Sequence, residues 1–232
     1  MTDLSYLFQY NQTWAKNIIN ADPDFFQELS KIQTPRYLWI GCSDSRVPAN
    51  QITGLQPGEL FVHRNVANLV VHTDLNCLSV IQYAIDVLRV TDILVVGHYG
   101  CGGIKSALQA KPLGLIDNWL RHVQDVSHRH EILQDPHMDV DLRTDLLCEL
   151  NVIDQVRNIA RTTIVGHAWR REQDLNVHGW IYSLSDGLLT DLEVSLTAKT
   201  DVVACIRSAT LNAYARYDLS CQNDETVVLK AV

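Results

Sequence analysis

Apolar and polar positions follow two kinds of pattern along this chain. Short apolar runs at residues 36–41 ("RYLWIG") and 92–98 ("DILVVGH") are nearly continuous. Such runs are typical of strands that are buried on both faces of a parallel sheet. A third apolar run, "GELFVHRNVAN" at residues 58–68, predicts another strand.

Between these runs, apolar residues recur at helical spacing. This spacing predicts helices over residues 3–20, 21–32, 74–90, 102–110, 115–133 and 145–161. Asp74 is the first residue of the third of these segments and is expected to cap the helix. We interpret "TTIVGHAW", residues 162–169, as a strand. Residues 176–196 are interpreted as two strands joined by a Ser-Asp-Gly turn.

Strands that alternate with helices favour an α/β fold with a central, mainly parallel β-sheet flanked by helices. The length of 232 residues favours a single domain. We divide this domain into an N-terminal helical arm (1–34), an α/β core (35–200) and a C-terminal helical segment or tail (201–232). The chain shows no internal repeat and no Pro/Gly-rich linker.

Chemically active side chains follow two of the predicted strands. "CSDSR" places Cys42, Asp44 and Arg46 after the run at residues 36–41, and "GHYGCGG" places His98 and Cys101 at and just after the end of the run at residues 92–98. In a parallel sheet, functional sites lie beyond the carboxyl ends of the strands. Alternate residues of an extended chain lie roughly 6.6 Å apart. Cys42 and Asp44 therefore reach one metal only if the chain bends, and Gly41 permits such a bend.

Thiolate, imidazole and carboxylate together form a zinc ligand set, and they are too soft a set for magnesium or calcium. The alternative is that both cysteines are core thiols and His98 is a capping residue. For either motif alone the two interpretations are equally good. The presence of both motifs at strand ends favours zinc.

Composition limits the possible partners. The net charge of −8 argues against nucleic acid and anionic membrane surfaces as partners. No apolar segment approaches the roughly 20 residues needed to span a bilayer. The first 16 residues lack the pattern of a secretory signal, so we expect a cytoplasmic location. The six cysteines are therefore not expected to form a disulfide framework.

Five segments together resemble the β-class carbonic anhydrases, and in particular the bacterial type. They are "CSDSRVPA", "GELFVHRNVAN", "GHYGCGG", "NVIDQVRNI" and "HGWIY", and the resemblance runs from about residue 25 to about residue 192. It implies an α/β fold with zinc at the carboxyl edge of the sheet. It also implies reversible hydration of CO2 to bicarbonate, and homodimers or homotetramers in which N-terminal helices pack on a neighbouring subunit.

Carried over residue by residue, the resemblance implies that Cys42, His98 and Cys101 bind zinc. Asp44 would be either the fourth ligand or the partner of Arg46, and both residues would be catalytic. We suggest that an Asp44 carboxylate that leaves zinc pairs with Arg46, so that hydroxide takes the vacant position as the nucleophile. Low pH would favour the closed form. Because two thiolates weaken zinc as a Lewis acid, we expect activity to rise toward alkaline pH.

A subgroup of the family carries a non-catalytic, allosteric bicarbonate site, which this chain matches at Trp39, Arg64 and Tyr182. Guanidinium, phenol and indole groups all donate hydrogen bonds to a planar anion. The alternative is that both aromatic residues belong to the core and Arg64 pairs with an acid. Gln33 stands where relatives place an amide of the substrate pocket.

The remaining histidines and two of the cysteines are expected to be structural or solvated. His63, His72, His167 and His178 are interpreted as structural, His128, His130 and His137 as solvated, and Cys77 and Cys148 as core residues. Two rival functions remain. One is an enzyme of the same fold that acts on carbonyl sulfide or carbon disulfide. The other is a non-catalytic zinc protein that senses bicarbonate, against which the presence of both Asp44 and Arg46 argues.

Overall fold

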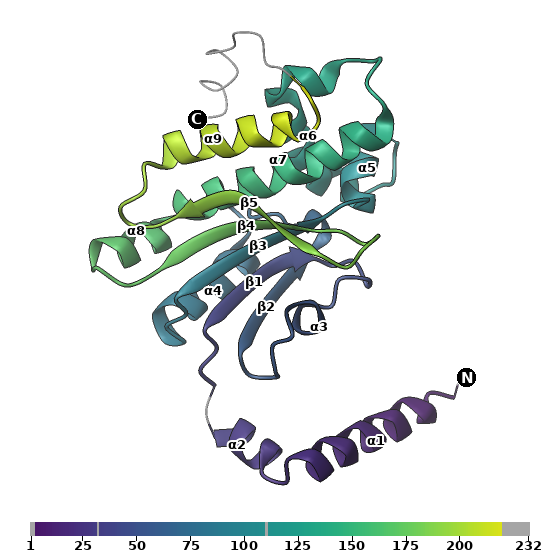
Figure 1. Ribbon diagram of the computed structural model, residues 1–232, viewed down its shortest axis with the longest axis vertical. Coiled ribbons are helices and arrows are strands. Elements are labelled where there is room, and N and C mark those ends of the chain that lie inside the picture. Colours follow the sequence, from purple (N-terminus) through teal and green to yellow (C-terminus); the bar gives the residue numbers. More distant parts are fainter. Residues whose placement is uncertain (1–2, 32, 110, 220–232) are drawn as a thin grey trace. The chain divides into compact units, whose positions relative to one another are not determined.

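The computed structural model describes residues 3–31, 33–109 and 111–219, and it divides the chain into two compact units, Met1–Thr34 and Pro35–Val232 (Figure 1). The first unit contains helices α1 (Ser5–Ala21) and α2 (Phe25–Lys31), as the apolar spacing predicts. The rings of Trp14 and Phe26 meet edge to face at 5.6 Å and join these helices. None of the residues of α1 is buried.

The second unit is built on a five-stranded sheet of order β2-β1-β3-β4-β5. Its strands are β1 (Tyr37–Cys42), β2 (Leu60–Asn65), β3 (Asp92–His98), β4 (Asn176–Tyr182) and β5 (Leu189–Leu196). The first four strands in this order are parallel, and β5 runs antiparallel to β4. The predicted α/β fold with a mainly parallel sheet is confirmed.

The helices of this unit lie between and after the strands. They are α3 (Ala49–Thr53), α4 (Leu75–Gln82), α5 (Gly102–Gln109), α6 (Ile116–Arg129), α7 (Val140–Ala160), α8 (Thr163–Arg170) and α9 (Val202–Ala215), with short turns η1 (Val66–Asn68), η2 (Tyr83–Val87) and η3 (Glu131–Gln134). Asp74 caps α4 as expected, because its carboxylate accepts from the backbone N–H of Asn76. The C-terminal segment predicted over residues 201–232 begins with α9, and its residues 220–232 lie outside the described residues.

The strand predicted over residues 162–169 is wrong, because these residues form helix α8. The β-branched residues at its start favour a strand on propensity alone. The side chain of Thr162 overrides this preference by accepting a hydrogen bond from the N–H of Val165, which starts the helix. Val165 and Ala168 then share a buried face, as residues three apart on a helix do.

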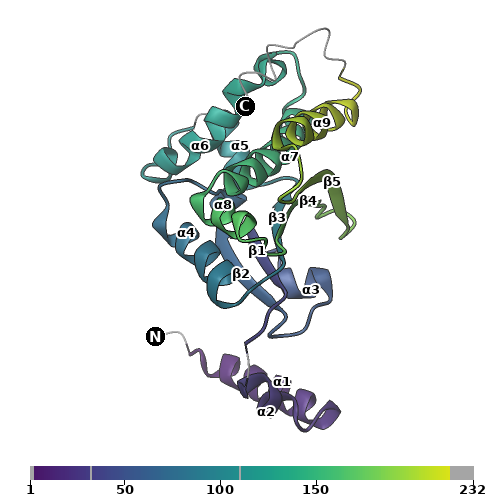
Figure 2. The ribbon, with the colours of Figure 1, turned by 90° about the vertical axis from the view of Figure 1, so that its left-hand side faces the viewer.

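Two apolar clusters lie on opposite faces of the sheet. The larger cluster fills the space between the sheet and helices α4 to α9 (Figure 2). Within it, α7 packs across β3, β4 and β5, and α9 packs on α7 and β5. The smaller cluster, around Trp39, Leu94 and Val96, lies on the face that carries α3. Among the described residues, no helix is both long and apolar enough to cross a membrane.

Candidate metal centre

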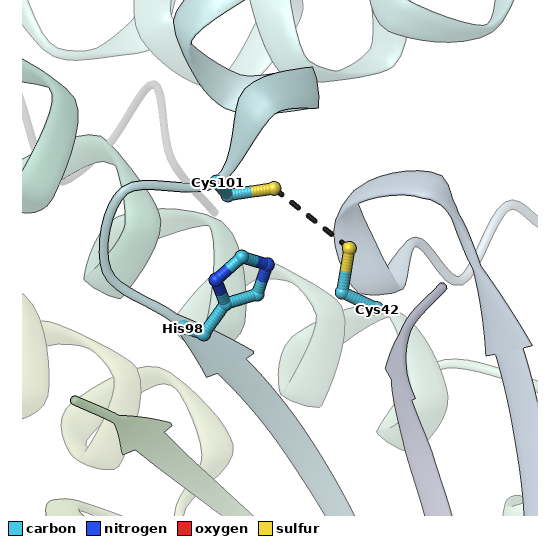
Figure 3. Close-up of side chains that lie close together, drawn as sticks. All are labelled: Cys42, His98 and Cys101. Atoms are coloured by element: carbon cyan, nitrogen blue, oxygen red, sulfur yellow. Dashed lines mark hydrogen bonds between the residues drawn. The ribbon is translucent and has the colours of Figure 1, made fainter. Parts of the chain in front are cut away.

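Cys42 and His98 are the last residues of β1 and β3, which are neighbouring parallel strands. Their side chains therefore meet at one edge of the sheet, as the position of the two sequence motifs predicts. Cys101 lies three residues after His98, where α5 begins. Gly100 reverses the chain between them with a φ of 64°, a conformation that favours glycine. Figure 3 shows the three side chains converging.

The geometry of this group suits a small metal ion. The ligand atoms of Cys42, His98 and Cys101 all lie within 4.8 Å of one another, and the two sulfur atoms are 3.8 Å apart. The three residues are buried, with exposed fractions of 5%, 1% and 2%. Two thiols and an imidazole form a ligand set that zinc favours.

The orientation of the His98 ring supports this interpretation. Its Nδ1 lies 3.0 Å from the carbonyl oxygen of Tyr99 and must donate to it, because a carbonyl only accepts. Nε2 therefore carries the lone pair. This atom is buried and has no hydrogen-bond partner. Metal-binding histidines commonly show this arrangement, in which one nitrogen is fixed by a carbonyl and the other faces the ion.

The sulfur atoms of Cys42 and Cys101 lie within hydrogen-bonding distance. The hydrogen bond from Cys101 lowers the pKa of Cys42, although burial opposes this shift. The same interaction with Cys42, together with burial, raises the pKa of Cys101. Cys42 is therefore the more acidic of the two thiols, and a bound cation would favour ionisation of both.

Asp44 lies beside the three residues but outside their group. Its carboxylate accepts from the Arg46 side chain in a bidentate arrangement, with distances of 2.9 Å from Nε and 2.7 Å from Nη2. The Arg46 guanidinium holds the pKa of Asp44 well below its usual range. Asp44 Oδ2 is also 3.8 Å from His98 Nε2. Of the two predicted arrangements, the structure shows the one in which Asp44 pairs with Arg46.

The three residues predicted to bind bicarbonate lie on three strands of the sheet: Arg64 on β2, Trp39 on the neighbouring β1, and Tyr182 on β4, which β3 separates from β1. Trp39 is fully buried in the smaller cluster, and the partly buried Tyr182 packs against that cluster. The indole N–H of Trp39 has no hydrogen-bond partner. Arg64 donates to the backbone carbonyls of Cys42 and Asp44. The structure therefore links Arg64 to the backbone of the metal centre.

Gln33 lies in the first unit and is exposed. Its place in a substrate pocket stays a prediction. Gly41 lies within β1. A side chain at Gly41 would collide with the indole of Trp39, so the glycine makes room for that ring.

Sequence reasoning missed a polar network behind the metal centre. Glu149 is fully buried on α7 and binds Tyr99, which stands between His98 and Gly100. Arg216 and Tyr217, which follow α9, bind the same carboxylate. A lone acid in the apolar run "LLCELNVI" was the signal that could have revealed it, because a buried carboxylate requires partners.

One prediction about the other histidines is wrong. His130 is not solvated but 5% exposed, and its Nδ1 lies 2.6 Å from the hydroxyl of Tyr214. The ring of His130 is buried where the end of α6 meets α9. The residues around His130 in the sequence are polar and therefore do not indicate a core position. His128 and His137 are exposed, and Cys77 and Cys148 are buried as predicted.

A second group of possible ligands contains His63, Asp74 and Cys77. Two of its members already have partners. Asp74 caps α4, and His63 Nε2 lies 3.2 Å from the amide nitrogen of Asn65. Burial raises the pKa of Cys77 to about 12, which keeps this thiol protonated. We therefore interpret His63, Asp74 and Cys77 as structural residues rather than as a second metal site.

Comparison with known proteins identifies similar chains. A family model described as carbonic anhydrase matches residues 37–189. A carbonic anhydrase of Emericella nidulans is 47% identical over 188 residues, which make up 81% of this chain and 82% of the relative. These relatives do not distinguish the bacterial type that the motifs predict.

Solved structures agree with this finding. A β-carbonic anhydrase of Coccomyxa, in complex with acetazolamide, matches with a TM-score of 0.85 and 37% identity over 95% of this chain and 100% of the other. A tetrameric β-carbonic anhydrase of Sordaria macrospora matches with a TM-score of 0.79 and 36% identity over 83% of this chain and 98% of the other.

Proposed function

The chain belongs to the β-class carbonic anhydrase family, and from this membership we propose that Cys42, His98 and Cys101 bind the zinc ion of a carbonic anhydrase. The reaction of the family is the hydration of CO2 to bicarbonate and a proton. Zinc supplies the hydroxide for this reaction by lowering the pKa of a bound water molecule. The observation that carries the proposal is the buried, unpartnered Nε2 of His98, which faces two thiol groups.

Asp44 and Arg46 are proposed to act as a gate. In the observed arrangement, Arg46 holds the Asp44 carboxylate by its backbone N–H and its guanidinium. Asp44 Oδ2 is then close to the metal centre and is available to accept a hydrogen bond from the attacking water. A rotation of the same carboxylate toward His98 would fill the fourth ligand position and exclude water.

Either arrangement gives the Asp44 carboxylate a cationic partner, which is Arg46 in one case and the metal ion in the other. The choice between them therefore depends on competition for one anion. At low pH fewer hydroxide ions compete for the fourth position. We therefore expect activity to rise toward alkaline pH.

We further propose that bicarbonate binds at Trp39, Arg64 and Tyr182 and inhibits the enzyme. Two observations support this site. The Trp39 indole N–H is a buried donor that lacks an acceptor. Arg64 donates to the carbonyls of Cys42 and Asp44, so an anion that draws the guanidinium away would release the backbone on which the gate depends.

Replacement of single donors tests the bicarbonate site. We expect Trp39→Phe and Tyr182→Phe to abolish inhibition by bicarbonate while each keeps an aromatic ring in the cluster. Tyr37→Phe is the matched control. Tyr37 packs on the same cluster but lies at the start of β1, at the end of the strand away from the metal centre. Inhibition that persists in both variants would remove this site from the proposal.

Self-association and a cytoplasmic location complete the proposal. The exposed apolar residues of α1 support a role for the N-terminal helices in packing on a second subunit. The tetrameric relative from Sordaria macrospora supports the same idea. The location rests on the sequence pattern alone.

A stopped-flow assay of CO2 hydration, combined with measurement of zinc content, tests the main proposal. We expect one zinc ion per chain and faster turnover at alkaline pH, with activity strongly reduced in Asp44→Asn at unchanged zinc content. Replacement of Cys101 by Ser should reduce the zinc content itself. Full zinc occupancy without CO2 turnover, or turnover that is independent of pH, would contradict the proposed mechanism.

A further inference from the structure

The zinc ligands His98 and Cys101 lie in a short segment, residues 98–101, which we call the metal loop. We propose that Glu149 is a positioning residue that links this loop to the C-terminal end of α9, and that Arg216 thereby helps to retain zinc. The inference rests on the proposed zinc site. It assigns a function to residues that neither the sequence motifs nor the proposed gate involves.

Glu149 lies at the centre of the network. Its side chain is fully buried on α7, and both carboxylate oxygens are used. Oε1 accepts from the hydroxyls of Tyr99 at 2.7 Å and Tyr217 at 3.1 Å. Oε2 accepts from Arg216, at 2.9 Å from Nε and 2.6 Å from Nη2. A buried carboxylate is stable when its charge is paired and its lone pairs are filled, as they are here.

On one side, the network fixes the metal loop. Tyr99 follows His98 directly, and its carbonyl accepts a hydrogen bond from the N–H at Nδ1 of His98. The position of Tyr99 therefore orients the imidazole that faces the metal. Asp145, one helical turn before Glu149, accepts from the N–H of Gly100 at 3.3 Å. Two acids on one face of α7 thus hold two successive residues of the loop.

On the other side, the network ends at the surface. Arg216 and Tyr217 directly follow α9, which packs on α7 and β5. The Arg216 side chain is 29% exposed, whereas that of Glu149 is inaccessible. Loss of Arg216 would leave a buried negative charge uncompensated. The carboxylate would then shift toward water, and this movement would weaken the hydrogen bond that holds Tyr99.

The rate of zinc release to a coloured chelator measures this effect on the intact, zinc-loaded chain. We expect Arg216→Met to release zinc about tenfold faster than the wild type, at the lower end of the 10–100-fold effects known for partners of metal ligands. Arg216→Lys keeps the charge and should restore much of the retention. Arg207→Met is the matched control, because Arg207 is an exposed arginine on α9, the helix that Arg216 directly follows.

A second control separates positioning from general stability. Tyr214 lies on α9, and Tyr214→Phe removes the contact of 2.6 Å between its hydroxyl and the buried His130. We expect this variant to lower the melting temperature without faster zinc release. Glu149→Gln should release zinc faster, and addition of Arg216→Met to it should have little further effect, because the charge that Arg216 neutralises is already gone.

The outcomes distinguish the two proposals. A wild-type chain that fails to bind zinc would overturn the proposed function. A wild-type chain that binds zinc, together with Arg216→Met that releases it at the wild-type rate, would overturn the positioning role alone. The same applies if Arg216→Met and Tyr214→Phe speed release in proportion to their loss of thermal stability. Faster release in Arg216→Met with rescue by lysine supports the inference.

Discussion

At the scale of single residues, Arg46 determines where the Asp44 carboxylate lies. Its side chain is 58% exposed, so its replacement leaves no hole in the core. We expect Arg46→Met to reduce CO2 hydration about 10–100-fold at unchanged zinc content, because an unpaired Asp44 carboxylate would turn toward the metal ion. Stopped-flow kinetics together with metal analysis check both parts of this prediction.

Arg36→Met provides the control for Arg46. Arg36 also pairs with an aspartate, Asp92, but at the amino-terminal end of the sheet and with a side chain that is 68% exposed. Such surface pairs contribute little to stability. The control should therefore keep wild-type activity. If Arg46→Met is as active as Arg36→Met, Arg46 plays no part in the reaction.

His130 makes stability depend on pH. Burial, and secondarily the nearby Arg129 and Arg157, lowers its pKa from 6.5 to about 4. The unfolded chain therefore takes up a proton on this ring before the folded chain does. The stability that the neutral ring contributes is complete above about pH 6.5 and is lost as the pH falls toward 4.

Urea unfolding at pH 7.5 and pH 5.5 measures this dependence. We expect the wild type to lose about 1.4 kcal/mol more than His130→Gln between these two values, which corresponds to one pH unit below the unfolded pKa. The comparison with the variant subtracts the effect of acid on the metal ligands. Equal losses in both proteins would show that His130 does not titrate on unfolding.

The sequence predicted the residues of the metal centre because they directly follow apolar runs and carry unusual chemistry. Cys42 and His98 end adjacent parallel strands, and the distance between them follows from the sheet alone. Glu149 and its partners could not be predicted in this way. They come from the loop between β3 and α5, from α7 and from the residues after α9, and only tertiary packing brings these segments together.

At the scale of elements, the close contact between α7 and the sheet depends on glycine. A Cβ atom at Gly179 in β4 would lie 2.5 Å from a methyl group of Val194 and 3.0 Å from one of Val152. We expect Gly179→Ala to destabilise the protein by about 1–3 kcal/mol, because overpacking forces neighbouring side chains to shift. Thermal or urea unfolding measures this change.

Gly166 in α8 provides the opposite case. A Cβ atom there meets only the end of the flexible Arg170 side chain, at 3.5 Å. Gly166→Ala should therefore stabilise the protein by about 0.5–1 kcal/mol, the difference in helix propensity between the two residues. Effects of equal sign at the two glycines would contradict this account of the packing.

Helix α8 also shows why local patterns fail at the scale of elements. The β-branched residues at its start indicate a strand, and only the Thr162 cap and the packing of Val165 against the core decide for a helix. The strands of the sheet were predicted more reliably. In β1 and β3 every residue after the first is buried, so their apolar runs are nearly continuous, as expected of strands covered on both faces.

At the scale of the whole molecule, the helices of the second unit cover the two faces of its sheet unequally. Helices α4 to α9 pack on one face, and the short α3 packs on the other (Figure 2). Parallel sheets normally have both faces covered. Val62 of β2 is 38% exposed. This asymmetry supports the proposal that a second copy of the chain covers part of the surface.

Helix α1 offers apolar groups for such an interface. Phe8 is 71% exposed and Tyr10 is 68% exposed, and exposed aromatic residues often mark an interaction surface. Burial of one phenylalanine side chain contributes about 1.5–3 kcal/mol. We therefore expect Phe8→Glu to raise the dissociation constant of the assembly by about 10–100-fold, measured by sedimentation over a range of protein concentrations.

Gln12→Glu is the matched control for Phe8→Glu. It adds the same charge to an exposed position of the same helix without removal of an apolar group. The control should keep the wild-type mass at all concentrations, since added charge alone does not remove buried area. If both variants associate as the wild type does, α1 takes no part in assembly. If both dissociate, charge repulsion at α1 rather than lost apolar burial explains the result.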